Sequence, residues 1–351
     1  MAYSNLRALS PFRVELHQLI SSPLASSGNT SGHEVLLEDR RAETVPDATI
    51  ERLSLIIEQA SNNLPPGDNE DPEIALNKLY SIEHTLTTNN FVCSIPWFLV
   101  PSLAQGLELK PLQNQQLIFA GENRYRRAHI EKNINQDFSH VDCDLSSLVY
   151  LSISETIGLP ICFVEVPGHN FIRWNFTNGK YINWDTNFGY NRFTDDEYAR
   201  MYGAQKEQID NGTYLSNMTK ANVLGYFGLC RGGTLDSQGK IDEAISEYYF
   251  GLENYPQSPV PGNVLAWKFV SSRRAQQIIT PNQALELSRK ACSIFRSADN
   301  LDTLACVLAE HGEFEEAIAI ETEAYQLDPR TEFKAMIDAF KLGQTWLDIN
   351  G

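Results

Sequence analysis

The sequence has no long apolar run, no excess of positive charge and no C-x-x-C pair. No stretch of ~18 consecutive apolar residues occurs, so we expect no segment that spans a membrane. The formal net charge of −17 argues against nucleic acids and anionic membranes as main partners, since both need basic surfaces. The N-terminus lacks the basic region, apolar run and cleavage site of a signal peptide, so a cytoplasmic protein is expected.

The six cysteines show no regular spacing. Zinc-binding motifs need close pairs, and a disulfide framework is typical of short secreted chains rather than one of 351 residues. We therefore expect reduced thiols and no resident metal or cofactor. Calcium has no support either, because no acidic loop of the EF-hand type is present. The cysteines are Cys93, Cys143, Cys162, Cys230, Cys292 and Cys306.

Cys143 stands immediately before a run with helical periodicity. Gly158 and Pro160 end that run, and four serines are expected to fill much of its remaining surface. A thiol in the first turn of a helix meets the positive end of the helix dipole, which favours the thiolate. Asp142 and Asp144 oppose this effect, so a histidine partner would be needed. The apolar residues at helical spacing are Leu145, Leu148, Val149, Ile153 and Ile157.

Three short segments with strand character follow the helix. If Gly179 adopts the left-handed conformation, the last two segments are joined by a three-residue loop. Asp185 then lies opposite Phe171, on the same sheet face as His169 and one step along. A two-residue Asn-Gly loop would instead place Asp185 on the other face, because a one-residue slip inverts every side chain. The three segments are 161–166, 169–176 and 181–188.

A cysteine at a helix start, a Gly-Leu-Pro stop and the order strand–His–strand–Asp resemble the catalytic core of the transglutaminase-like superfamily. The resemblance covers residues 140–189 of the 351. It implies a papain-like α+β fold in which helices pack on an antiparallel sheet. It also implies that Cys143 is the nucleophile, His169 the base and Asp185 the residue that orients the histidine, in acyl transfer or amide hydrolysis.

An oxyanion donor is harder to assign from the sequence. Trp97, Gln116 and Asn123 are conceivable pocket groups, but their spacing selects none of them. The backbone N–H of Cys143 is the expected donor. His140 lies three residues before the cysteine and is an alternative base, although a surface position is expected for it.

Upstream of this core the sequence predicts helices and loops. Helices are expected from Thr49, from Pro72 and over 112–133, and a short helix is expected over 12–20. Residues 21–32 are expected to form a loop or linker. The apolar stretch 91–106, broken by two prolines, is expected to line the core. A small basic cluster is expected on a solvated helix face; its members are Arg124, Arg126, Arg127 and His129.

A repeat begins at about residue 221. Two units share a glycine, an alanine five residues on, a small residue seven further on and a proline five beyond that. This pattern resembles tetratricopeptide (TPR) repeats, in which small residues let paired helices pack closely. A middle unit carries only two alanines at the same spacing, and another helical hairpin array is the alternative. The two sets are Gly239, Ala244, Gly251 and Pro256, and Gly312, Ala317, Ala324 and Pro329.

These features predict three segments. Residues 1–48 form an N-terminal arm that is flexible, packed on the core or a pro-segment over the cleft. Residues 49–217 form the transglutaminase-like catalytic domain, in which the polar connection 191–217 carries a lid or a packing loop. Residues 218–351 form an all-α, TPR-like repeat domain, which either binds a protein partner or buttresses the catalytic domain.

The favoured interpretation is a cysteine-dependent acyl-transfer enzyme that acts on amide bonds of a protein or peptide substrate. Water as acceptor gives a protease or amidase and an amine gives a transamidase, and the sequence distinguishes neither. The alternative is a catalytically inactive scaffold that recruits proteins through its repeats. Thiol reactivity separates the two: an activated Cys143 should alkylate well below about pH 8, whereas an inert one should titrate near 8.5.

Overall fold

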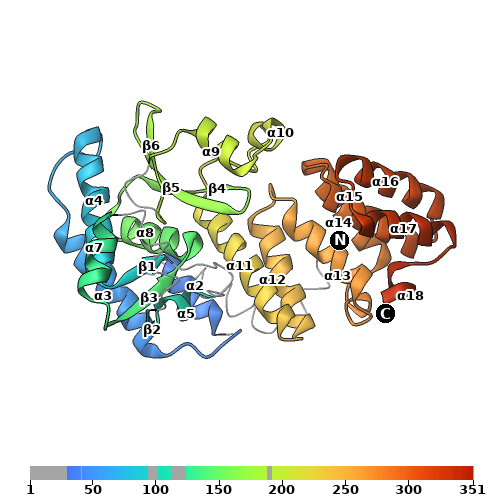
Figure 1. Cartoon of the computed structure of the whole chain (residues 1–351), viewed down its shortest axis with the longest axis horizontal. Helices are drawn as coiled ribbons and strands as arrows, with labels where there is room; N and C mark the ends of the chain where they lie inside the picture. The colour runs from blue at the N-terminus through green and yellow to red at the C-terminus, as the bar shows by residue number, and fades with distance from the viewer. Residues whose placement is uncertain (1–29, 41, 94–101, 113–123, 188–191, 351) are drawn as a thin grey trace. The chain divides into compact units, whose positions relative to one another are not determined.

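A computed structural model describes residues 30–40, 42–93, 102–112, 124–187 and 192–350 (Figure 1). The chain is of mixed α+β type with a helical C-terminal region. It divides into two compact units. The first comprises the described residues up to Ala204 together with Leu215–Lys220, and the second comprises Gln205–Tyr214 and the described residues from Ala221 onward.

The first unit contains two small sheets and the helices that cover them. In one sheet β3 is central, parallel to β1 and antiparallel to β2; in the other, β4, β5 and β6 are antiparallel in chain order. The strands are β1 (Phe91–Cys93), β2 (Leu109–Pro111), β3 (Asp137–Val141), β4 (Ile161–Val166), β5 (His169–Asn175) and β6 (Tyr181–Trp184). The helices are α2 (Ser31–Asp39), α3 (Asp47–Asn63), α4 (Pro72–Thr88), α5 (Leu103–Leu107), α7 (Arg124–Lys132), α8 (Cys143–Ile157) and α9 (Asp195–Tyr202).

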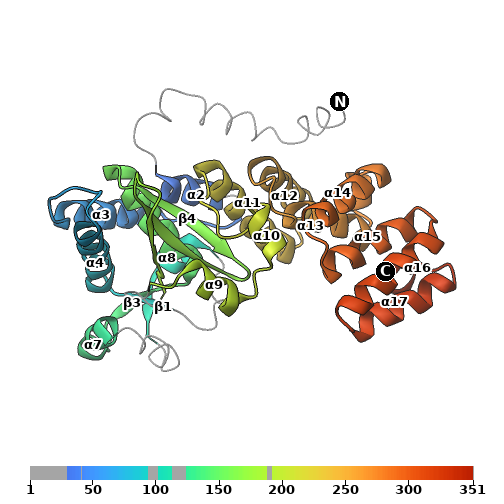
Figure 2. The same ribbon diagram turned by 90° about the horizontal axis from the view of Figure 1, so that it is seen from above.

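Helix α8 is the central element of this unit and lies against the sheet of β4 and β5 (Figures 1 and 2). Its predicted apolar side is buried, and α2 and α3 pack on it as well. The expectation that serines cover its remaining surface is wrong: Ser146, Ser147, Ser152 and Ser154 are all buried. Their hydroxyls bond to carbonyl or hydroxyl oxygens, and their small size lets neighbouring elements approach on every side.

The first turn of α2 docks on α8. The backbone N–H and hydroxyl of Ser31 donate to the Glu155 carboxylate at 2.6 and 2.5 Å, and the N–H of Gly32 donates to Ser152 Oγ at 2.8 Å. A Cβ on Gly32 would lie 2.4 Å from that oxygen, so the contact needs glycine. Ser31 and Gly32 therefore begin a helix, and the loop predicted over 21–32 is wrong at this end. Residues 1–29 lie outside the described ranges, as does the helix expected over 12–20.

The hairpin of β5 and β6 has the register that the triad interpretation requires. Phe176 N–H donates to the Lys180 carbonyl at 2.9 Å, and Gly179 has φ +79°. The loop between them therefore has three residues, with the glycine in the left-handed conformation. Because Ile172 pairs with Trp184, the next residue, Asp185, lies opposite Phe171 as expected. The last strand is shorter than predicted and ends at Trp184.

Other upstream predictions are only partly met. Helix α4 begins at Pro72 as predicted, with Asp71 as its N-cap. Of the helix expected over 112–133, the structure shows α7; Leu112 is not helical, and 113–123 lie outside the described residues. The stretch 91–106 gives β1 and most of α5, and 94–101 lies outside the described residues. The parallel pairing of β1 with β3 was not predicted, because it joins segments more than 40 residues apart.

The second unit is helical. Two of the predicted glycines, Gly239 and Gly312, have φ +75° and +78° and separate consecutive helices at equivalent positions. A Cβ on Gly251 would lie 2.7 Å from Leu229, so this predicted small residue lets two helices pack closely. The helices are α10 (Lys206–Asp210), α11 (Lys220–Ser237), α12 (Ile241–Asn254), α13 (Val260–Ser271), the 3₁₀ turn η5 (Ala275–Gln277), α14 (Pro281–Ile294), α15 (Ala298–Glu310), α16 (Phe314–Leu327), α17 (Thr331–Lys341) and α18 (Trp346–Asn350).

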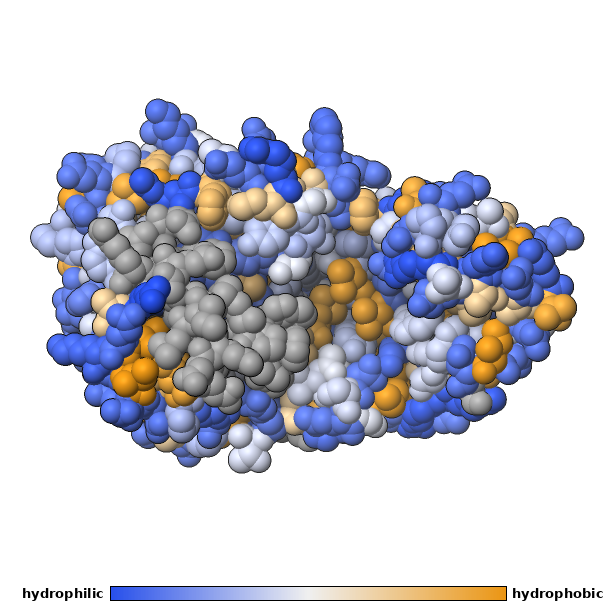
Figure 3. Space-filling model, in the orientation of Figure 1, coloured by the Kyte–Doolittle hydropathy of each residue, from blue (hydrophilic) through white to orange (hydrophobic). Residues whose placement is uncertain are grey.

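The surface of each unit is mostly hydrophilic on the face that Figure 3 shows, with apolar residues in scattered small groups. Single exposed apolar side chains such as Leu342 are ordinary in folded proteins. Within the described ranges, no helix combines the length and the apolar content needed to cross a bilayer.

Candidate active site

Cys143 is the first residue of α8, as the sequence predicted. Asp142 caps the helix, because its Oδ1 accepts a hydrogen bond from the backbone N–H of Leu145 at 3.1 Å. The thiol therefore lies in the first turn, where backbone N–H groups have no intrahelical acceptors. Strand β3 ends at Val141 and directs the chain into this turn.

His169 and Asp185 are brought together by the hairpin. His169 Nε2 lies 2.9 Å from Asp185 Oδ2, and both side chains are buried. A carboxylate only accepts, so Nε2 carries the hydrogen, and Nδ1 is left as the nitrogen that can take a proton. Asp185 also accepts from the backbone N–H of Asn187 at 3.0 Å and from the Tyr198 hydroxyl at 3.2 Å. The imidazole is thus oriented by an anchored carboxylate.

Helix α9 covers this pair with two aromatic rings. Tyr202 stacks on the His169 imidazole, with centroids 4.6 Å apart and an interplanar angle of 10°. Tyr198 stacks on Phe171 at 3.9 Å while its hydroxyl reaches Asp185. The sequence placed both tyrosines in the connection expected to carry a lid or a packing loop, but it assigned neither of them to the site. Their spacing of four residues, one helical turn, was the available signal.

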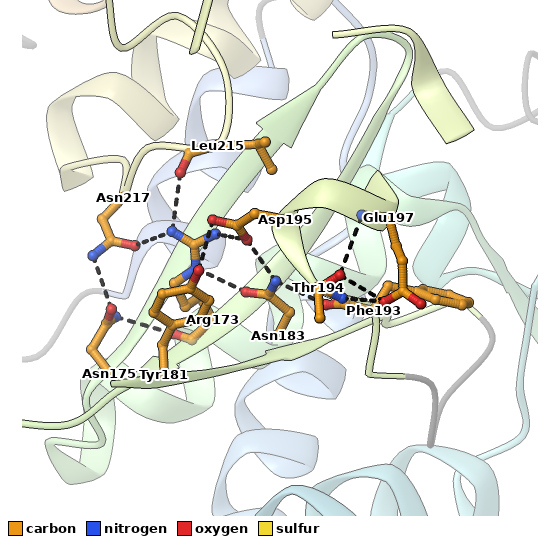
Figure 4. Close-up of polar contacts among 10 residues, drawn as sticks. All are labelled: Arg173, Asn175, Tyr181, Asn183, Phe193, Thr194, Asp195, Glu197, Leu215 and Asn217. Carbon is orange, nitrogen blue, oxygen red and sulfur yellow. Dashed lines mark hydrogen bonds and ion pairs between the residues drawn. The ribbon is translucent and has the colours of Figure 1, made fainter. Parts of the chain in front are cut away.

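Arg173 anchors the beginning of α9 (Figure 4). Its Nη2 lies 2.6 Å from Asp195 Oδ1, its Nε donates to Asn183 Oδ1 at 2.8 Å, and its Nη1 donates to the Leu215 carbonyl at 3.0 Å. Asn183 in turn donates to the same Asp195 oxygen at 2.8 Å. One buried guanidinium therefore ties β5 and β6 to the helix that carries Tyr198 and Tyr202.

Asp195→Ala is expected to lower the free energy of unfolding by about 2 kcal/mol, because it removes a charged acceptor shared by Arg173, Asn183 and Tyr181. Chemical denaturation of the full chain measures this. Asp196→Ala is the matched control: it lies in the same first turn, loses the same helix-dipole interaction and is exposed. Equal destabilisation by the two variants would contradict an anchoring role for Asp195.

The surroundings of Cys143 favour the neutral thiol. Burial raises the pKa of the Cys143 thiol well above its usual range, the charges of Asp144 and Asp142 raise it further, and a backbone hydrogen bond from Asn170 opposes the rise. The thiol donates to Asp144 Oδ1 at 3.8 Å, and the Asn170 amide donates to the same oxygen. Within the described residues no hydrogen bond joins the thiol to His169. The dipole effect predicted at the helix start is therefore outweighed.

Alkylation of Cys143 by iodoacetamide is expected to accelerate steadily from pH 6 to about pH 9 without a plateau, because the raised pKa keeps the resting thiol neutral and the reaction depends on removal of its proton. Asp144→Asn removes one of the charges that raise the pKa and should accelerate the reaction at pH 7. Peptide mass spectrometry resolves the rate at Cys143, with Cys162 as an internal reference in the same digest. A plateau below pH 8 in the wild type would contradict this account.

Two polar residues lie where the sequence did not place them. Arg126, expected on a solvated face, is 1% exposed and paired with Glu83. Glu83 lies 43 residues from Arg126 in the chain, so only the fold brings its carboxylate beside the guanidinium. His140, expected at the surface, is buried in β3, and its Nε2 lies 3.3 Å from the Lys110 carbonyl. Burial lowers the pKa of His140.

The side chains considered for an oxyanion hole, Trp97, Gln116 and Asn123, lie outside the described residues. Among the residues that the structure describes, no three His, Cys, Asp or Glu side chains are grouped as metal ligands would be.

Comparisons with known proteins add little. No protein-family model matches the sequence, and no curated protein matches it. Among solved structures, the chain is similar to the first TPR of Spaghetti (RPAP3), solved bound to the HSP90 peptide SRMEEVD. The match has a TM-score of 0.31 and 20% identity and covers 34% of this chain and 93% of that one. The transglutaminase-like core stays a prediction.

Proposed function

We propose that the chain is a cysteine-dependent acyl-transfer enzyme that acts on amide bonds of a protein or peptide substrate. Cys143 is the nucleophile, His169 the base and Asp185 the residue that orients the base. The observation that carries the proposal is the hydrogen bond from His169 Nε2 to the buried Asp185 carboxylate, which leaves Nδ1 available to a thiol. We also propose that the first unit has a papain-like fold.

The resting thiol is neutral, so the proton must leave during attack. As the sulfur adds to the substrate carbonyl, His169 Nδ1 takes the thiol proton, and Asp185 stabilises the resulting imidazolium. The backbone N–H of Cys143 at the start of α8 donates to the developing oxyanion. His169 then returns the proton to the leaving amine, and the acyl group remains on sulfur. Water as acceptor completes hydrolysis, and an amine completes transamidation.

A second candidate is a scaffold that keeps this fold without catalysis. The observation that favours it is the thiol environment: Cys143 donates to Asp144 rather than to the imidazole, and its pKa is raised. In that case the TPR-like helices of the second unit are the functional part and bind a protein or peptide partner. In the enzyme they would recruit the substrate.

We also propose that the protein resides in a reducing, cytoplasmic compartment. All six cysteines are free, and burial raises the pKa of Cys93 and Cys306, which keeps both protonated at neutral pH.

Activity-based labelling tests the proposed function. Wild type, Cys143→Ser and His169→Ala are incubated in a lysate, and adducts on the chain are identified by mass spectrometry. We expect an acyl adduct on Cys143 in the wild type, none in Cys143→Ser and much less in His169→Ala. Cys162→Ser, which removes another partly exposed thiol, should label normally. The absence of any Cys143 adduct in the wild type would favour the scaffold.

A further inference from the structure

A buried ion pair joins α4 to α7. Arg126 Nε lies 2.6 Å from Glu83 Oε1, and Arg126 Nη2 lies 2.9 Å from Glu83 Oε2. Both side chains are 1% exposed. This two-point contact is the arrangement that a planar guanidinium makes with a carboxylate, and it satisfies two charges that burial would otherwise penalise.

The same guanidinium reaches the chain immediately after Asp185. Arg126 Nη2 donates to the Thr186 carbonyl at 3.1 Å, and Nη1 donates to the Asn187 carbonyl at 3.1 Å. The Ser146 hydroxyl of α8 donates to the Thr186 carbonyl as well, at 3.1 Å. The carbonyls of the two residues that follow Asp185 are therefore held from α7, and the first of them from α8 as well.

The residue before Asp185 is tied to the same ion pair. Trp184 Nε1 donates to the Tyr150 hydroxyl at 3.1 Å, and that hydroxyl donates to Glu83 Oε2 at 2.9 Å. All three of these side chains are fully buried. The network thus brackets Asp185: it reaches the preceding residue through Glu83 and the following residues through Arg126.

We propose that the Glu83–Arg126 pair positions Asp185 for its hydrogen bond to His169 and thereby sets the direction in which the imidazole faces. This inference rests on the proposed acyl-transfer function. Asp185 lies one residue beyond the end of β6, so the strand ladder alone does not fix it. Catalytic groups need to be held within about 0.5 Å of their productive positions, and a supporting network of hydrogen bonds provides this. Glu83 and Arg126 act through Asp185 and are positioning residues.

Arg126→Lys separates positioning from folding. Lysine keeps a positive charge beside Glu83, but a single ammonium cannot span the carboxylate and two carbonyls. We measure the iodoacetamide alkylation rate of Cys143 in wild type, Arg126→Lys, Asp185→Ala and the double variant. Alkylation of Cys143 is expected to be about tenfold slower in Arg126→Lys than in the wild type. The double variant is expected to react no more slowly than Asp185→Ala alone, because the two residues act in one network. Arg127→Lys, an exposed neighbour paired with Glu131, should match the wild type.

A second readout does not depend on thiol chemistry. Nuclear magnetic resonance follows the exchange with water of the His169 Nε2 proton, which should become faster in Arg126→Lys and stay unchanged in Arg127→Lys. The inference is overturned if Arg126→Lys leaves this exchange at its wild-type rate, or if its effect on alkylation is the same with and without Asp185. If instead His169→Ala leaves wild-type alkylation unchanged, the acyl-transfer function fails, while the exchange rate still decides the positioning role.

Discussion

Replacement of Arg126 by methionine is expected to lower the free energy of unfolding by about 3–5 kcal/mol, the cost typical of removing one partner from a buried ion pair. The Glu83 carboxylate would stay buried without its counter-charge, and the Thr186 and Asn187 carbonyls would each lose the hydrogen bond from Arg126. Denaturant titration of the full chain, followed by tryptophan fluorescence, measures the loss. The buried residue Trp184 reports directly on this region.

Two further variants make this prediction specific. Arg127→Met, on the exposed side of α7, should change stability by no more than about 0.5 kcal/mol. The double variant Glu83→Met/Arg126→Met should recover much of the loss, because no unpaired charge remains buried. If Arg126→Met were no more destabilising than Arg127→Met, the ion pair would not support this part of the fold.

His169→Ala is expected to slow acylation of Cys143 by about 10²–10⁴-fold, the usual contribution of a general base. The effect should be large because the thiol is neutral at rest and needs a group to take its proton. Release of p-nitrophenol from p-nitrophenyl acetate under single-turnover conditions gives the acylation rate, with acetate as a generic acyl group. Cys143→Ser should abolish the Cys143-dependent phase.

His140→Gln is the matched histidine control. His140 lies three residues before the cysteine, and glutamine can still bond to the Lys110 carbonyl. Burial already lowers the pKa of His140, so we expect no role for it in accepting the thiol proton. A loss of acylation in His140→Gln equal to that in His169→Ala would show that the base has been assigned to the wrong histidine.

The parts of the site that the sequence predicted are local in the chain. The helix start at Cys143 follows from a capping aspartate and helical periodicity. The face shared by His169 and Asp185 follows from one loop, because Gly179 sets the register of the whole hairpin. A local signal also worked in the second unit, where Gly239 was predicted from the repeat pattern and lies between two consecutive helices.

The parts that the sequence did not predict depend on contacts between distant segments. Periodicity places Arg126 on a helix, but only the fold shows that Glu83 lies beside it. The serines of α8 are buried because α2, α3 and a sheet surround the helix, and no pattern within α8 indicates this. The stacking of Tyr202 on His169 likewise joins residues on separate elements.

The central claim is that the His169 imidazole activates the Cys143 thiol. Site-resolved alkylation of Cys143 at pH 7, compared between wild type and His169→Ala at equal reagent concentration, tests it most directly. The account predicts a clearly slower reaction at Cys143 in the variant and an unchanged rate at Cys162 in the same digest. Equal rates at Cys143 in the two proteins would contradict it and leave a folded scaffold with a helical repeat region.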